Sequence, residues 1–260
     1  MGESVIIEKK EGVATIWLNR EQVRNAFNEE MIADLQKALE KLDQDPTLRL
    51  LILRGKGPVF CAGADLNWMR KAVDYSYNQN MEESLTLAKM LNTLYAFPKP
   101  TIALVHGAAI GGGIGLISCC DFVFSLNDTK FSFSEVKLGL VPAVISPYAI
   151  KRIGERHAKQ LMLTGKLFGE DEARDVGLVD FFGGEVEVQA QVSSVISLIR
   201  DAGPEAVSKC KRLVSNVVNQ WTMEEAIEKT SGLIAEIRSA DEAQEGMRAF
   251  LAKKKPNWKG

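Results

Sequence analysis

The sequence is poor in the residues that build several common kinds of active site. Only two histidines, His106 and His157, occur among 260 residues, so neither a histidine-ligated metal site nor a Ser-His-Asp triad is expected. The four cysteines match no zinc-binding spacing, and Cys119 and Cys120 are too close for an easy mutual disulfide. We therefore expect reduced thiols and no metal ligands.

Long apolar runs and a strong charge of one sign are also missing. No stretch approaches the roughly 18 uninterrupted apolar residues of a membrane-spanning helix, and the net charge of −2 does not indicate a nucleic-acid-binding surface. The first ten residues, MGESVIIEKK, form neither an apolar signal core nor an Arg- and Ser-rich leader. These absences predict a cytoplasmic protein with no nucleic-acid partner and no membrane partner.

The hydrophobic pattern changes along the chain from mixed strands and helices to helices alone. Two runs rich in β-branched residues predict a hairpin, and Asn28 is expected to cap a helix with a 3.6-residue apolar rhythm. From Glu155 onward the pattern is mostly helical. Element order therefore predicts an α/β core over residues 1–190 and a helical region over 191–260. The predicted strands are Ser4–Lys9, Val13–Leu18, Leu48–Leu53, Thr101–Val105, Phe122–Ser125 and Phe131–Phe133, and the predicted helices include Tyr77–Leu94, Glu185–Arg200, Pro204–Val218 and Met223–Ala240.

Two glycine-rich segments each follow a predicted buried strand. They are residues 57–66 (GPVFCAGADL) and residues 106–115 (HGAAIGGGIG). Small residues let a ligand approach the backbone, and a strand-to-helix turn leaves N–H groups unpaired. Two such turns side by side would give two donors for one oxygen, which is an oxyanion hole. A purely structural turn is the alternative, whereas the P-loop and the dinucleotide-binding patterns are both incomplete.

A single carboxylate, Glu135, follows in a largely apolar segment, residues 131–140 (FSFSEVKLGL). Such surroundings raise the pKa of a carboxyl group, which suits proton transfer near neutral pH. A glutamate at a helix N-terminus that serves only as a cap is the alternative.

These motifs together resemble the crotonase (enoyl-CoA hydratase/isomerase) superfamily. The resemblance rests on FCAGADL at 60–66, on HGAAIGGGIGL continuing to Cys120-Asp121, on SEVKLGL followed by Pro142, and on LTG and ARDVGLV further along. It implies a spiral of strand-strand-helix units with a helical C-terminal region that forms trimers, which commonly pair into hexamers. It also implies an acyl-CoA thioester as substrate, with no separate cofactor because CoA is part of that substrate.

The resemblance assigns roles to particular residues. It makes Glu135 the proton-transfer group and the N–H groups of Ala64 and Gly112 the oxyanion hole, with Gly112 opening a helix toward Cys120. Arg24 and Ala26 correspond to a segment near the CoA adenine and phosphates, whereas Phe250 and Lys253 correspond to a helix that usually reaches CoA from a neighbouring subunit. The implied substrate-binding residues are Arg24, Ala26, Ala62, Ala64, Asp65, Leu66, Gly112, Gly115, Phe250 and Lys253.

One position departs from the pattern of the family. A typical hydratase carries a second glutamate two positions after the glycine triplet, where this sequence has Gly115. Residues 60–69, 113–121 and 134–147 resemble a subgroup, the bacterial 3-methylglutaconyl-CoA hydratases of leucine breakdown, which shares this glycine. We therefore expect reversible hydration of a short branched 2-enoyl-CoA with a distal carboxylate, and Gly115 would leave room beside its β-carbon. Candidate partners of the distal carboxylate are Arg70, Lys71 and Tyr148.

Other functions stay open from the sequence. A general short-chain enoyl-CoA hydratase, a one-base isomerase and a decarboxylase all fit a single glutamate. A protein that binds CoA esters without catalysis is disfavoured by Glu135 together with both glycine-rich segments. Nucleic-acid binding through residues 253–255 is disfavoured by the near-neutral charge.

Overall fold

The computed structural model describes residues 4–259, and the contacts within the chain fall into two units. The first unit comprises the residues up to Phe97 together with Thr101–Val192, and the second comprises Pro98–Pro100 and the residues from Ser193 onward. The division falls inside helix α7 (Glu185–Asp201), which also contains the predicted boundary between residues 190 and 191. Each unit is described by itself below.

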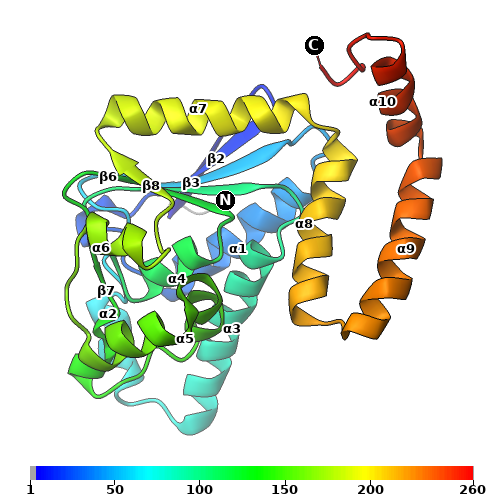
Figure 1. Ribbon diagram of the computed structural model, residues 1–260. Coiled ribbons are helices and arrows are strands. Elements are labelled where there is room, and N and C mark those ends of the chain that lie inside the picture. Colours follow the sequence, from blue (N-terminus) through cyan, green and yellow to red (C-terminus); the bar gives the residue numbers. More distant parts are fainter. Residues whose placement is uncertain (1–3, 260) are drawn as a thin grey trace. The chain divides into compact units, whose positions relative to one another are not determined.

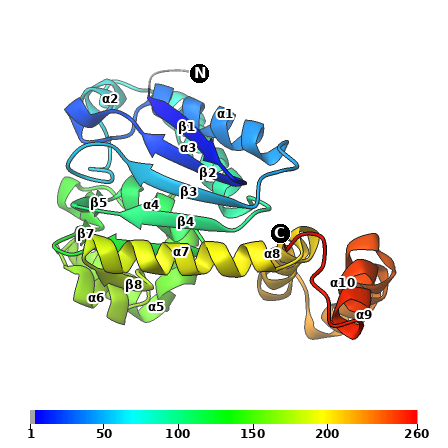
Figure 2. The same ribbon diagram turned by 90° about the horizontal axis from the view of Figure 1, so that it is seen from above.

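A six-stranded sheet forms the centre of the first unit. The hairpin β1 (Val5–Lys10) and β2 (Val13–Leu18) is antiparallel, and its turn places Glu11 and Gly12 at positive φ. Every further pairing is parallel, in the order β1-β2-β3-β4-β6-β8. Figure 2 shows β1 to β4 lying side by side. The remaining strands are β3 (Leu50–Gly55), β4 (Thr101–Val105), β6 (Phe122–Leu126) and β8 (Phe181–Gly183).

Helices α1, α3 and α4 lie on one side of this sheet (Figure 1). Helix α1 (Glu29–Asp43) begins where the Asn28 side chain accepts a hydrogen bond from the Met31 N–H, as the sequence predicts, and its apolar stripe is buried. Helix α3 (Tyr77–Tyr95) has a capping box built by Ser76. The other helices of this unit are α2 (Leu66–Ala72), α4 (Gly112–Ser118), α5 (Ser146–Thr164) and α6 (Glu170–Asp175), with two 3₁₀ turns, η1 (Glu21–Val23) and η2 (Ser134–Leu138).

The second unit is helical, as the sequence predicts. Helices α8 (Pro204–Asn219) and α9 (Met223–Ser239) run in opposite directions, and α10 (Asp241–Leu251) follows (Figure 1). Thr222 and Glu225 form a capping box at the start of α9. No helix within residues 4–259 is both long and apolar enough to cross a lipid bilayer.

The expected α/β class is confirmed, and strand β8 is the main correction. The chain beyond Glu155 was expected to be mostly helical, but Phe181–Gly183 pairs with β6 and extends the sheet by one strand. Three residues are too few for a period-2 pattern, so only long-range pairing identifies this strand. The second short pair, β5 (Ala108–Ile110) with β7 (Lys130–Ser132), is parallel and lies outside the main sheet.

Candidate active site

The two glycine-rich segments lie next to each other, joined by backbone hydrogen bonds. Cys61 bridges to Ala109: the Cys61 N–H donates to the Ala108 carbonyl at 3.0 Å, and the Ile110 N–H donates to the Cys61 carbonyl at 3.0 Å. On the other side of the same segment, Phe27 bridges to Ala64. Three chain segments far apart in the sequence therefore form one small ladder, as expected for two neighbouring turns.

The N–H groups of Ala64 and Gly112 are unused within this ladder. The Phe27 N–H donates to the Gly63 carbonyl (2.7 Å), and the Phe27 carbonyl accepts from the Asp65 N–H (2.8 Å). The bridge therefore uses the residues on either side of Ala64 and not the Ala64 N–H. Within residues 4–259, neither the Ala64 N–H nor the Gly112 N–H donates to another protein group. Both residues adjoin Phe27, because a Cβ atom on Gly112 would lie 2.8 Å from the Phe27 ring. The geometry thus provides two free donors next to one residue, Phe27, with Ala64 beside its backbone and Gly112 beside its ring.

The carboxylate of Glu135 lies beside the start of α4. Its Oε1 atom is 3.0 Å from the position that a Cβ atom on Gly111 would take. Among the described residues, the buried Oε2 atom has no hydrogen-bond partner. Burial raises the pKa of Glu135, and a hydrogen bond from its own backbone N–H acts in the opposite direction. Glu135 lies in the first turn of η2, whose N-cap residue Phe133 makes no side-chain cap.

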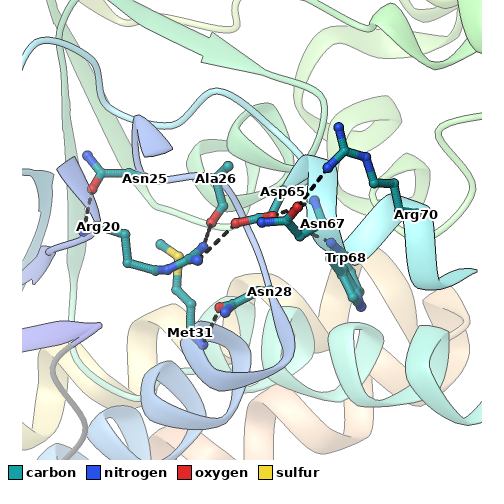
Figure 3. Close-up of polar contacts among 9 residues, drawn as sticks. All are labelled: Arg20, Asn25, Ala26, Asn28, Met31, Asp65, Asn67, Trp68 and Arg70. Carbon is teal, nitrogen blue, oxygen red and sulfur yellow. Dashed lines mark hydrogen bonds and ion pairs between the residues drawn. The ribbon is translucent and has the colours of Figure 1, made fainter. Parts of the chain in front are cut away.

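A largely buried ion pair anchors the loop that carries Ala64 (Figure 3). The Arg20 guanidinium donates to the Asp65 carboxylate at 2.9 Å and also to the Ala26 carbonyl. The other carboxylate oxygen of Asp65 accepts from the Asn67 N–H at 2.8 Å, which caps α2. Burial alone would raise the pKa of Asp65, but these hydrogen bonds hold that pKa below its usual value. The carboxylate of Asp65 is thus bound by protein groups, and its predicted contact with substrate stays a prediction.

The other predicted substrate-binding residues occupy different environments. Arg24 is exposed with φ +54°, and its carbonyl accepts from the Ala62 N–H at 3.0 Å, so these two residues are brought together. Ala26 is buried beside them, whereas Leu66 is 70% exposed at the start of α2. Phe250 and Lys253 belong to the second unit, where both side chains are exposed. Their contact with CoA stays a prediction.

Gly115 does not open a space, which corrects our expectation. A Cβ atom there would lie only 2.3 Å from Ile145 Cγ2 and 3.7 Å from Leu91 Cδ1. Ile145 and Leu91 are both buried, at 3% and 0% exposure. The volume that a side chain at position 115 would need is therefore filled by apolar groups.

Two of the three candidates for a distal carboxylate have polar protein partners, and the third has a ring contact. Lys71 lies 3.7 Å from the Glu29 carboxylate, and Arg70 donates to the Asn67 side chain at 3.1 Å. The Tyr148 ring packs on Tyr95, with centroids 5.2 Å apart, and burial raises the pKa of its hydroxyl to about 12. A substrate carboxylate would have to compete with the polar contacts of Lys71 and Arg70.

Three residues near the site were missed by sequence reasoning: Arg20, Phe27 and Ile145. Each acts through a partner distant in the chain: Asp65 for Arg20, Gly112 for Phe27 and Gly115 for Ile145. No local periodicity or motif identifies such pairs, so the sequence held no signal for them.

Comparison with known proteins agrees with this geometry. Residues 8–260 match the family model described as enoyl-CoA hydratase/isomerase. The chain is 32% identical over 258 residues to a crotonyl-CoA hydratase of Syntrophomonas wolfei, covering 98% of both chains. It is 31% identical over 252 residues to a peroxisomal Delta(3,5)-Delta(2,4)-dienoyl-CoA isomerase of Arabidopsis thaliana, covering 93% of this chain and 90% of the relative.

A solved structure is similar over nearly the whole length. The crystal structure of an enoyl-CoA hydratase from Shewanella pealeana superimposes with a TM-score of 0.94 at 37% identity, covering 98% of this chain and 96% of the other. A family model that spans almost the entire sequence and relatives above 30% identity lead to one conclusion. The chain belongs to the enoyl-CoA hydratase/isomerase family, the crotonase superfamily.

Proposed function

We propose that the chain is an acyl-CoA enzyme that hydrates 2-enoyl-CoA thioesters with Glu135 as its proton-transfer group. One observation carries the proposal: a carboxylate with a buried, unpartnered oxygen lies beside the start of α4, next to an unused backbone donor on Gly112. An unpaired buried carboxylate is costly for stability, which is typical of a group retained for chemistry.

The reaction follows from the donors and the single base. The N–H groups of Ala64 and Gly112 hold the thioester oxygen, on which negative charge develops when a nucleophile adds to the β-carbon. Glu135 takes a proton from water as the water oxygen bonds to the β-carbon, and it returns that proton to the α-carbon. The sum adds one water across the double bond, so no redox partner or further cofactor is needed.

The specific substrate proposed is 3-methylglutaconyl-CoA, whose hydration is reversible. Support comes from residues 60–69, 113–121 and 134–147, which resemble that subgroup of hydratases. The filled space at Gly115 removes one argument for a branched acyl chain, and a relative named as a crotonyl-CoA hydratase favours a general short-chain substrate equally.

Isomerisation of a double bond is the second candidate, favoured by the surroundings of Gly115. With Ile145 and Leu91 filling that position, Glu135 has no carboxylate partner there. A lone base can remove a proton from the α-carbon of a 3-enoyl thioester and return it to the γ-carbon, two carbons away. A relative named as a dienoyl-CoA isomerase is consistent with this chemistry.

The test is thioester absorbance in the near ultraviolet with three substrates in parallel. Purified protein is given 3-methylglutaconyl-CoA, crotonyl-CoA and 3-hexenoyl-CoA. Faster loss of the conjugated 3-methylglutaconyl signal supports the branched-acid hydratase, and faster loss of the crotonyl signal supports a general hydratase. Appearance of conjugation from 3-hexenoyl-CoA alone supports the isomerase. Absence of turnover with all three, despite tight binding, would overturn the proposal.

We also propose that the protein works as a trimer or a hexamer. The second unit exposes many large apolar side chains, and apolar side chains that gather into a patch mark an interaction surface. They include Val214, Val218, Ile227, Ile234, Phe250 and Leu251. Light scattering should give a mass of three or six times 28.7 kDa, and a monomer at micromolar concentration would contradict this assembly.

A further inference from the structure

Helix α2 directly follows the loop that carries the Ala64 donor, and its own packing is weak. The chain passes from Ala64 through Asp65 into α2, and within the described range Leu66–Ala72 no residue is fully buried. Leu66 at its start is 70% exposed, and Val73 after its end is 83% exposed. A short helix without a buried face depends on tertiary contacts for its position. The contacts of α2 therefore bear on the direction of the Ala64 N–H.

Trp68 connects this loop to α3 through two hydrogen bonds. Its backbone N–H donates to the Asp65 carboxylate at 3.4 Å (Figure 3), and its indole Nε1–H donates to the Glu83 carboxylate of α3. The ring of Trp68 is partly buried and packs against the hydrophobic core. One residue thus links the carboxylate next to Ala64 with a separate helix.

The bond between Trp68 and Glu83 is better shielded from water than the ion pair between α2 and α1. In that pair Lys71 lies 3.7 Å from the Glu29 carboxylate, and the two side chains are 62% and 55% exposed. Such exposed ion pairs contribute little to holding a segment in place. Glu83 is partly buried: burial raises its pKa, and the hydrogen bond from Trp68 acts in the opposite direction. A hydrogen bond to a carboxylate is roughly twice as strong as one between neutral groups.

We propose that Trp68 and Glu83 are positioning residues, whose hydrogen bond, which we call the tether, holds α2 against α3 and keeps the Ala64 N–H directed at the thioester oxygen. This proposal rests on the function proposed above and deepens it. The second donor, on Gly112, belongs to a different helix, α4, so a displacement of α2 changes the spacing of the two donors. Because oxyanion donors stabilise the transition state more than the bound substrate, loss of the tether lowers kcat and leaves KM nearly unchanged.

The activity test compares two replacements of Glu83, with the enoyl-CoA that the unmodified protein converts fastest. Glu83→Ala removes the acceptor and should lower kcat by about 10- to 100-fold, because a displacement of about 1 Å is that costly in an active site. Glu83→Gln keeps an acceptor oxygen for the indole and should retain most of kcat. Glu82→Ala is the matched control, since Glu82 is an exposed glutamate at the preceding position of the same helix, and it should keep the kcat of the unmodified protein. The same kcat in both Glu83 variants, whether lowered or unchanged, would overturn the proposal.

Replacing Trp68 tests the other end of the tether. Trp68→Phe keeps an aromatic ring and loses the donor, so kcat should fall as in Glu83→Ala, and the double variant should lose no more than either single variant. Trp17→Phe is the control, because the Trp17 indole makes the same kind of bond, to the Glu8 carboxylate at 2.9 Å, on the hairpin β1–β2. Its kcat should stay that of the unmodified protein. Additive losses at positions 68 and 83 would contradict a shared bond.

A spectroscopic readout follows the tether without any turnover. Protein labelled with 5-fluorotryptophan contains four fluorine labels, one in each tryptophan, and the Trp68 signal is the one lost in Trp68→Phe. Glu83→Ala should shift and broaden that signal, whereas Glu83→Gln and Glu82→Ala should leave it close to its place. A shifted signal with an unchanged kcat would overturn the positioning role. An unchanged signal in Glu83→Ala would overturn the tether itself, even if the unmodified protein turns over no enoyl-CoA and the proposed function fails.

Discussion

The guanidinium of Arg20 lies 2.9 Å from the carboxylate of Asp65, the residue that directly follows Ala64. The two side chains are 14% and 6% exposed, so the ion pair is shielded from water. Arg20 also donates to the Ala26 carbonyl (Figure 3). Ala26 precedes Phe27, which bridges to Ala64. Arg20 therefore holds both Asp65, which follows Ala64, and the segment that pairs with Ala64.

Replacing Asp65 by Ala should lower both stability and turnover. Removal of one partner of a buried ion pair costs about 3 kcal/mol, and the variant also loses the N-cap of α2. Urea unfolding measures the stability loss, and kcat with saturating substrate measures the displacement of the Ala64 donor. Glu155→Gln is the control, because its pair with Lys159 is exposed and contributes little to stability. Equal effects of both variants would contradict the anchoring role.

Replacing Glu135 by Gln should abolish most of the activity and spare binding. The amide cannot accept and return a proton, so kcat should fall by about 10²- to 10⁴-fold. Calorimetric titration with a CoA thioester should give a dissociation constant close to that of the unmodified protein. Retained turnover would exclude Glu135 as the proton-transfer group.

The same variant should also change how stability depends on pH. Burial raises the pKa of Glu135 in the folded protein above its ordinary value of 4.5, so its contribution to stability is present at acidic pH and is lost as pH rises through the folded pKa. Glu135→Gln should therefore be more stable than the unmodified protein at pH 7, by about 1 kcal/mol or less because the side chain is partly exposed. Urea unfolding at pH 4 should show a smaller difference, and a larger one would contradict the raised pKa.

Replacing Gly112 by Ala should damage the oxyanion hole. The new Cβ atom would lie 2.8 Å from the Phe27 ring, so the backbone at Gly112 or the ring has to move. Removing an oxyanion donor costs roughly 10²- to 10³-fold in kcat, which we take as the upper limit. Gly232→Ala in α9 should instead leave activity intact and stabilise that helix by up to about 1 kcal/mol. A fully active Gly112→Ala variant would argue against a donor at this position.

One of the four thiols should react with iodoacetamide far faster than the others. Cys210 is exposed, whereas Cys61, Cys119 and Cys120 are buried. Burial raises the pKa of Cys61 to about 12, so its thiolate is not populated near neutral pH. Mass spectrometry should find a single early adduct that disappears in Cys210→Ser, and the remaining thiols should react only after unfolding. Two early adducts would contradict the buried positions.

Local patterns predicted much of the framework. The hairpin β1–β2, helix α1 with its Asn28 cap and the helices of the second unit follow from periodicity and capping residues close together in the chain. Strand β8 was missed because three residues carry no period, and strand bounds moved by up to two residues because hydrogen-bond pairing sets them.

The sequence by itself determined the class of the fold and the two glycine-rich segments, because these depend on residue type and spacing along the chain. The role of Glu135 was predicted from the family resemblance of its segment and stays a prediction. Only the tertiary structure decided that Asp65 is bound by Arg20 and that Ile145 fills the space beside Gly115. Those contacts join residues 45 and 30 positions apart in the sequence. They depend on the close packing of side chains that are distant in the chain, which a local sequence pattern does not predict.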